Sequence, residues 1–170
     1  MTGYNIGGLP IGMGVTGLMD HTVDISANCM WNSDNGDPAN FTVPAGWSVK
    51  FWAIGTWLTH PHGPDGGPWN GPAGNGVPNQ GTYPCSGPES CMVIFTSPAA
   101  APGTKPNPTV WDWFKTNNQT FNYQNTNQYD VTFYFAANDN TYDNCSAYND
   151  NKGSITVYYQ FPEEAVKVNL

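Results

Sequence analysis

Four segments of the chain have the hydrophobic pattern of β-strands. In the first, apolar Val49, Phe51 and Ala53 alternate with Lys50 and Trp52, as in a strand with one buried face. The second is a continuous apolar run, which indicates a strand buried on both faces. The last two are rich in β-branched and aromatic residues. These segments are residues 48–57, 91–96, 130–136 and 154–161.

Weaker strand patterns and long loops lie between these segments. The weaker candidates are residues 22–25, 40–43 and 119–123, and the long loops are residues 58–84, 97–109 and 138–151. Short strands joined by long polar loops predict an all-β fold, a jelly-roll-like antiparallel β-sandwich with long binding loops at one end. Almost no helix is expected, and a helical turn would be tolerated only in residues 110–116, where Trp111 and Phe114 are three residues apart.

The chain is expected to hold one domain, since 170 residues suit a single core. Residues 1–20 are rich in glycine and apolar side chains but have no basic start, so they make a poor signal peptide. We interpret them as an N-terminal arm, and residues 21–170 as the β-sandwich. The arm is either a flexible or edge-packing segment, or a device for assembling a homo-oligomer.

Composition and charge narrow the possible functions. The net charge is −8, and the five basic residues are scattered lysines, so the clustered cations that nucleic acids require are missing. No apolar run is long enough to cross a bilayer as a helix. An even number of cysteines in an acidic, asparagine-rich chain favours an oxidising compartment, and hence an extracellular or cell-surface location.

The four cysteines do not form the paired C-x₂-C sets of a structural zinc site. Cys85 and Cys91 bracket the turn-like sequence CSGPESC, and we predict a disulfide between them. Cys29 and Cys145 would then pair with each other or stay free. Sequence alone leaves all three connectivities of four cysteines open.

The loop of residues 138–151 is rich in Asp and Asn. Carboxylate, amide and backbone oxygens are the ligands that Ca²⁺ prefers, so this loop is a candidate calcium site, although such loops are also solvated turns. A tryptophan near a loop, such as Trp69, could stack on the C–H face of a sugar. Trp47, Trp52 and Trp57 are expected in the core. No nucleophile elbow or zinc-protease motif is present, so we expect a binding protein and not an enzyme.

Taken in order, these segments resemble the calcium-dependent galactophilic lectins of the Pseudomonas PA-I type. The similar stretches are VPAGWSVKFWAIGTW (43–57), PWNGPAGNGVPNQG (68–81), CSGPESCMVIF (85–95), YDVTFYFAAND (129–139) and AYNDNKGSITV (147–157). The resemblance implies a β-sandwich that holds one Ca²⁺. The ion in turn would bind galactose, so that glycans carrying galactosides are the expected partners.

The same resemblance implies the residues of the site. Side chains and backbone carbonyls together would bind the metal, and the expected ligands are Asp139, Asp150, Asn151, Ala147 and His60 (or Thr59 in place of His60). The expected sugar-binding residues are Gln80, Asp139, Asp150, Val77 and His60. Val77 stands where the family has a sugar-contacting histidine, so one polar contact to the sugar is lost.

Two alternatives stay open at this stage. Residues 140–146 are an insertion relative to the family, and within them Asp143 and Asn144 offer a competing register for the metal ligands. A different class of function also suits the composition: a structural subunit of a surface layer, appendage or filament built on the same β-sandwich.

Overall fold

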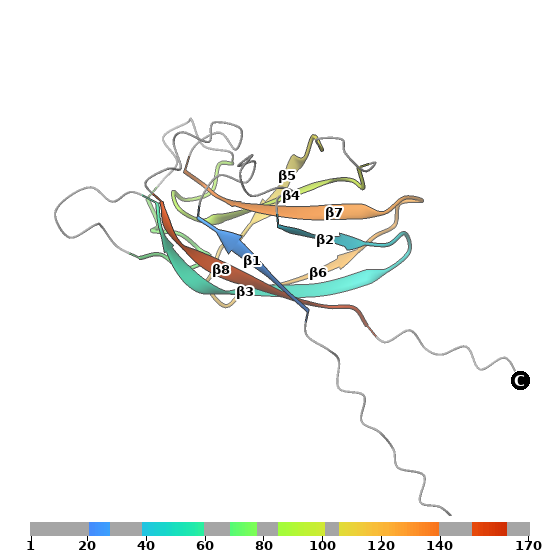
Figure 1. The fold of residues 1–170 in the computed structure, drawn as a ribbon, viewed down its shortest axis with the longest axis horizontal. Coiled ribbons are helices and arrows are strands. Elements are labelled where there is room, and N and C mark those ends of the chain that lie inside the picture. Colours follow the sequence, from blue (N-terminus) through green and yellow to red (C-terminus); the bar gives the residue numbers. More distant parts are fainter. Residues whose placement is uncertain are drawn as a thin grey trace, which may run out of the picture.

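The computed structural model describes residues 21–27, 39–59, 69–77, 85–100, 106–139 and 151–162. They form two antiparallel four-stranded sheets that pack face to face (Figure 1). The strands are β1 (His21–Ser26), β2 (Asn40–Val43), β3 (Ser48–Leu58), β4 (Met92–Pro98), β5 (Thr109–Trp113), β6 (Thr120–Gln124), β7 (Val131–Ala137) and β8 (Lys152–Gln160). None of the described residues is helical, and so no helix among them is long and apolar enough to cross a membrane.

The strand order identifies the architecture. Sheet A has the order β1-β8-β3-β6 and sheet B the order β2-β7-β4-β5. Strands next to each other in the sequence mostly lie in opposite sheets, and every pairing is antiparallel, as in an eight-stranded jelly roll. The predicted all-β, jelly-roll-like sandwich is confirmed. The proposed arm, residues 1–20, lies outside the described residues.

Aromatic side chains fill the space between the two sheets. The Phe41 ring stacks on Phe133 with centroids 5.2 Å apart, and the Phe51 ring stacks on Phe121 at 5.1 Å. Buried and exposed residues alternate along β3, as the hydrophobic pattern of its sequence predicts. The core therefore rests on the inner faces of β2, β3, β6 and β7, with β8 adding buried aliphatic residues.

Sheet B is also covered on its outer side. Every residue of β7 is buried, and β4 is buried over most of its length, which confirms the expected two-sided burial of that run. A second apolar cluster lies there, made of Cys85, Cys91, Val93, Phe95, Tyr134 and Ala136, with Trp113 packed against it. Gly87 lies so close to this cluster that a Cβ would come within 2.7 Å of the Trp113 ring. Residues 85–91 thus help to cover sheet B.

The helical turn tolerated in residues 110–116 is not found there, because this segment begins with strand β5. A bulge opposite Ile94 and Phe95 inserts one extra residue into the pairing of β4 with β5. The extra residue shifts the alternation, so that Trp111 contacts core rings such as Phe133, and Phe114 is fully buried. The three-residue spacing between Trp111, which is 37% exposed but contacts core rings, and the buried Phe114 therefore goes with a bulge here and not with a helix.

Two of the three tryptophans expected in the core lie at the surface. Trp57 is fully buried, but Trp47 is 36% exposed and Trp52 is half-buried on the outer side of sheet A. Trp52 follows the alternation of β3, which points it away from the neighbouring buried Phe51 and Ala53. The expectation that these tryptophans lie in the core rested on the size of the indole ring, which does not determine the face of the sheet on which a residue lies.

The two ends of the sandwich differ in what they carry. β1 pairs with β8 so that His21 lies opposite Tyr159, and Ser26 lies opposite Ser154. The start of β1 and the end of β8 therefore share one end of the molecule (Figure 1). The opposite end holds the close of β7 and the start of β8, and there the candidate site lies.

Candidate functional site

The site is built on two buried side chains, one from each sheet. Asp139 follows β7 of sheet B, and Asn151 precedes β8 of sheet A. Both are about 95% buried, since 5% and 6% of their surfaces are exposed. The Asn151 amide nitrogen donates to a carboxylate oxygen of Asp139 at 3.0 Å. Two predicted metal ligands, twelve residues apart in the sequence, are thus brought into direct contact.

The orientation of the Asn151 amide is fixed by its partners. Its nitrogen donates both to Asp139 and to the carbonyl oxygen of Ala27, at 3.0 and 2.9 Å. Both partners accept hydrogen bonds, so the reversed amide would place its oxygen against two other oxygens. In the observed orientation Oδ1 of Asn151 is buried and has no hydrogen-bond partner among the residues that the structure describes. A buried acceptor without a donor is costly, and a cation is one group that could satisfy it.

The donor set suits a calcium ion better than a transition metal. Asp139 and Asn151 offer carboxylate and amide oxygens, the hard ligands that Ca²⁺ takes in sets of about six to eight. Among the described residues no three of His, Cys, Asp and Glu come together, so the soft or nitrogen-rich set typical of zinc is not found there. Further oxygens would have to come from neighbouring loop residues.

Asn138 holds the strand that leads to Asp139. Its side-chain amide donates to the carbonyl oxygens of Gly87 and Pro88 at 3.0 and 2.9 Å, and its oxygen accepts from the Cys85 amide at 3.2 Å. Its backbone carbonyl accepts from the Ser90 amide at 2.9 Å. The turn of residues 85–91 is therefore wrapped around the residue next to Asp139. The sequence showed Asn138 only as one asparagine among many in its loop.

The end of β3 is joined to the same turn. The Trp57 indole donates to the carbonyl oxygen of Ser90 at 2.8 Å, and the Thr59 hydroxyl hydrogen-bonds the Ser90 hydroxyl. Ser90 has φ 63°, a left-handed conformation that is unusual for a residue with a side chain. Thr59, an alternative carbonyl ligand, is 2% exposed at this end of the sandwich. His60, the preferred one, lies outside the described residues.

Val77 is joined through Glu89 to the end of the sandwich that carries Asp139 and Asn151. The Glu89 amide donates to the Val77 carbonyl at 2.9 Å, and Glu89 precedes Ser90, which bonds to Asn138. The Val77 side chain is 42% exposed, so an apolar surface stands where the resembling family has a polar contact. The remaining predicted residues, Gln80, Ala147 and Asp150, lie outside the described residues. So do Asp143 and Asn144, the competing register.

Trp69 provides an exposed aromatic ring close to the site. A Cβ on Gly153 would come within 2.6 Å of the Trp69 ring, and Gly153 has φ 89° and lies two residues after Asn151. The ring is 55% exposed, so one of its faces is available to a ligand. Whether Trp69 stacks on a sugar stays a prediction.

Cys85 and Cys91 are free thiols in the structure, so the covalent bond expected between them is absent. They do lie side by side and hydrogen-bond each other. The Cys91 thiol donates in this bond, which raises its pKa, and burial raises it further. The same bond lowers the pKa of Cys85, whose sulfur also accepts from the Gly87 amide at 3.3 Å. Cys29 and Cys145 lie outside the described residues.

Comparison with models of known protein families gives no match for this chain, and comparison with curated proteins gives none either. The resemblance to galactophilic lectins therefore rests on the residues quoted for it alone.

Proposed function

We propose that the protein is a lectin that binds galactose-type sugars through a Ca²⁺ ion held at the Asp139–Asn151 pair. It would bind without turnover and act outside the cell or at its surface. The observation that carries the proposal is the buried Oδ1 of Asn151, which has no hydrogen-bond partner among the described residues and lies on an amide bonded to the Asp139 carboxylate.

Electrostatics favour a cation at this position. A carboxylate that is 95% buried loses most of its hydration, and a nearby positive charge compensates for that loss. The amide nitrogen of Asn151 supplies only a partial positive charge to the Asp139 carboxylate. Asp150, the preceding residue, would add a second carboxylate, and two carboxylates repel each other unless a cation lies between them.

The rest of the ligand set would come from residues around this pair. Carbonyl oxygens of Ala147 and of His60 or Thr59 would complete the protein ligands, as the resemblance implies. The ion would supply open coordination positions for two neighbouring sugar hydroxyls. Gln80 would hydrogen-bond the sugar, the exposed Val77 and Trp69 would contact its apolar face, and Asn138 would position Asp139.

Calcium titration calorimetry and thermal unfolding test the metal site. We expect Asp139→Ala and Asn151→Ala to abolish calcium binding. We also expect wild type alone to gain about 3 kcal/mol in unfolding free energy at a hundredfold excess of calcium over its Kd. Asp112→Ala is the matched control, since it removes an acid on sheet B that contacts Lys115 and the Trp113 amide and no residue of the proposed site. It should keep calcium binding intact.

A glycan array with and without EDTA tests the sugar. We expect signal on galactosides that EDTA abolishes. If both site variants bind calcium as the wild type does, the metal site is wrong. Self-association that needs neither calcium nor sugar, with no array signal, would instead favour the structural subunit of a surface layer or filament.

A further inference from the structure

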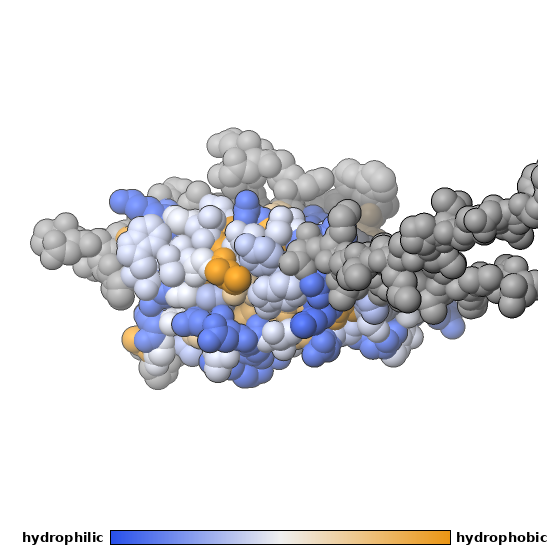
Figure 2. Space-filling view, turned by 90° about the horizontal axis from the view of Figure 1, so that it is seen from below, coloured by the Kyte–Doolittle hydropathy of each residue, from blue (hydrophilic) through white to orange (hydrophobic). Residues whose placement is uncertain are grey.

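The outer face of sheet A carries an aromatic platform. The Trp52 ring of β3 stacks on the Tyr158 ring of β8, with centroids 5.7 Å apart and planes within 7°. Both rings are half-buried, and Ile54 beside them is 59% exposed. Figure 2 views the molecule from this side and shows a small hydrophobic spot among polar residues. This face thus combines apolar and polar groups, in contrast to the outer side of sheet B.

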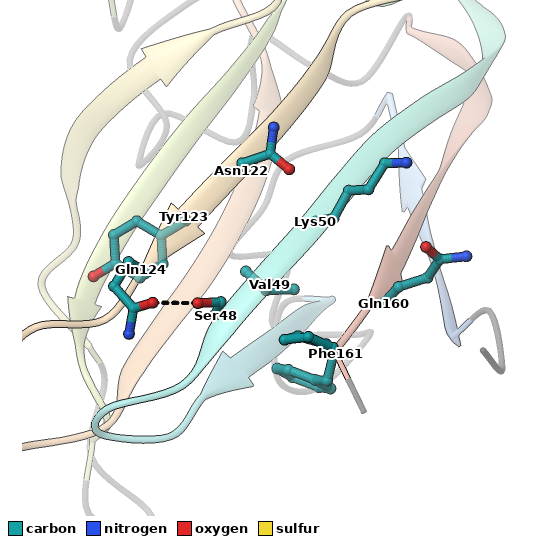
Figure 3. A pocket seen from close by; sticks show the side chains of 9 residues that line it. Ser48, Val49, Lys50, Asn122, Tyr123, Gln124, Gln160 and Phe161 are labelled. Atoms are coloured by element: carbon teal, nitrogen blue, oxygen red, sulfur yellow. Dashed lines mark hydrogen bonds between the residues drawn. The ribbon is translucent and has the colours of Figure 1, made fainter. Parts of the chain in front are cut away.

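Polar groups next to the platform are available to a ligand. Asn122 and Thr120 on β6 are exposed and, among the described residues, make no side-chain hydrogen bond. The Lys50 ammonium lies 5.7 Å from the Trp52 ring, where it can still donate to another group. Ser48 and Gln124 bond each other across the strands (Figure 3). These residues of β3 and β6, called the polar row below, are rich in amides and hydroxyls, and Lys50 is the one charged residue among them.

Two hollows lie along β3, one on each side of Trp52. The first has a volume of about 430 Å³ and is lined at its polar side by Lys50, Asn122 and Gln160 (Figure 3). The second has a volume of about 470 Å³ and is lined by residues that include Ile54, and at its far side by Trp69, the ring that borders the proposed calcium site. Lys50 and Ile54 are four residues apart, which is about 13 Å along a strand, so the face is longer than one sugar ring.

We propose that this face is a second carbohydrate site, independent of calcium, that binds a neutral linear polysaccharide. Sugar rings have an apolar C–H face that stacks on Trp52 and Tyr158, and hydroxyls that pair with the amides of Asn122 and Gln160. A chain molecule would use both hollows at once. Phosphate or sulfate polymers are disfavoured, because the protein has net charge −8 and the polar row offers only Lys50.

Affinity electrophoresis of the full-length protein tests this site. Native gels would contain galactomannan, laminarin or hydroxyethylcellulose, each with EDTA, and heparin as a polyanionic comparison. We expect retardation by at least one neutral polymer in EDTA and none by heparin. Trp52→Ala should weaken binding about tenfold or more. Tyr129→Ala removes a 52% exposed ring from the turn between β6 and β7, away from this face, and it should migrate as wild type does.

Ile54→Glu provides a second variant that keeps the proposal testable if Trp52→Ala unfolds. It introduces a charge at an exposed position that lines the second hollow, and it should also restore free migration. The proposal fails if no neutral polymer retards the protein in EDTA, or if both variants bind as wild type does. It also fails if sedimentation velocity shows a dimer that Ile54→Glu dissociates, since the face would then pair with a second copy. Asp139→Ala should leave this binding intact, which separates it from the calcium site.

Discussion

The two sheets of this sandwich share one core, yet their outer faces differ. Sheet B packs a second apolar cluster beneath residues 85–91, so β4 and β7 are buried on both sides. Sheet A leaves Trp52, Ile54 and the polar row in contact with solvent. We infer a division of roles. The covered sheet fixes the position of Asp139, and the uncovered sheet offers a surface on which a ligand can be received.

The largest difference in stability is expected between two truncations, one on the outer face of each sheet. Phe95 is fully buried on the outer side of sheet B, so Phe95→Ala should lower the free energy of unfolding by about 3–5 kcal/mol. Ile54→Ala on the outer side of sheet A should change it by less than about 0.5 kcal/mol. Urea unfolding measures both. Similar losses for the two variants would mean that sheet A is covered in solution.

A smaller loss of stability is expected when Asn138 is truncated, the residue whose side chain joins the end of β7 in sheet B to the turn of residues 85–91. Asn138→Ala removes a buried amide with three side-chain hydrogen bonds and leaves the Cys85 amide without its partner. We expect a loss of about 3 kcal/mol, with faster hydrogen exchange of that amide. Asn122→Ala, which removes an exposed amide from sheet A, is the control and should be neutral. If Asn138→Ala leaves the unfolding free energy unchanged, the turn keeps its place without the side-chain hydrogen bonds of Asn138.

The smallest change concerns the thiol pair in the same turn. Oxidised glutathione should convert Cys85 and Cys91 to a disulfide with release of two reduced glutathiones. Closing so short a loop should add about 2 kcal/mol to the unfolding free energy. Cys85→Ser should abolish the gain. Peptide mapping would confirm that the bond has formed. If the stability of the wild type is nevertheless unchanged, the turn is already fixed by Asn138.

The reactivity of the two thiols should also depend differently on pH. A lowered pKa means that Cys85 deprotonates at lower pH than an ordinary cysteine, whereas the raised pKa of Cys91 delays its deprotonation. Iodoacetamide should therefore label Cys85 first as pH is raised, as followed by mass spectrometry. Equal labelling of both would contradict the hydrogen bond between them.

Most of the fold could be predicted from the sequence, because burial determines the local pattern. The continuous apolar run of β4 and the alternation of β3 could be read directly. Strand β5 was missed because none of its residues is fully buried and a bulge interrupts its pairing with β4, so its sequence shows no regular apolar alternation. The surface position of Trp52 was missed because an indole ring suits a core and a binding platform equally well.

The site could be predicted only in part, for a related reason. Asp139 and Asn151 were expected from the resemblance and do meet in the structure. The parts played by Ala27 and Asn138 could not be seen, because one acts through a backbone carbonyl and the other through contacts with residues about fifty positions earlier. Such partners depend on tertiary packing, which leaves no local trace in the sequence.

The pairing of His21 with Tyr159 has a practical consequence for any experiment that attaches the protein to a surface. Whatever precedes His21 or follows Pro162 starts from the end of the sandwich away from the Asp139–Asn151 pair (Figure 1). The chain therefore enters β1 and leaves β8 at the end away from the proposed calcium site. Force applied between the two termini would open the β1–β8 ladder one hydrogen bond at a time from that end, so the site would be the last part of the ladder to feel the load.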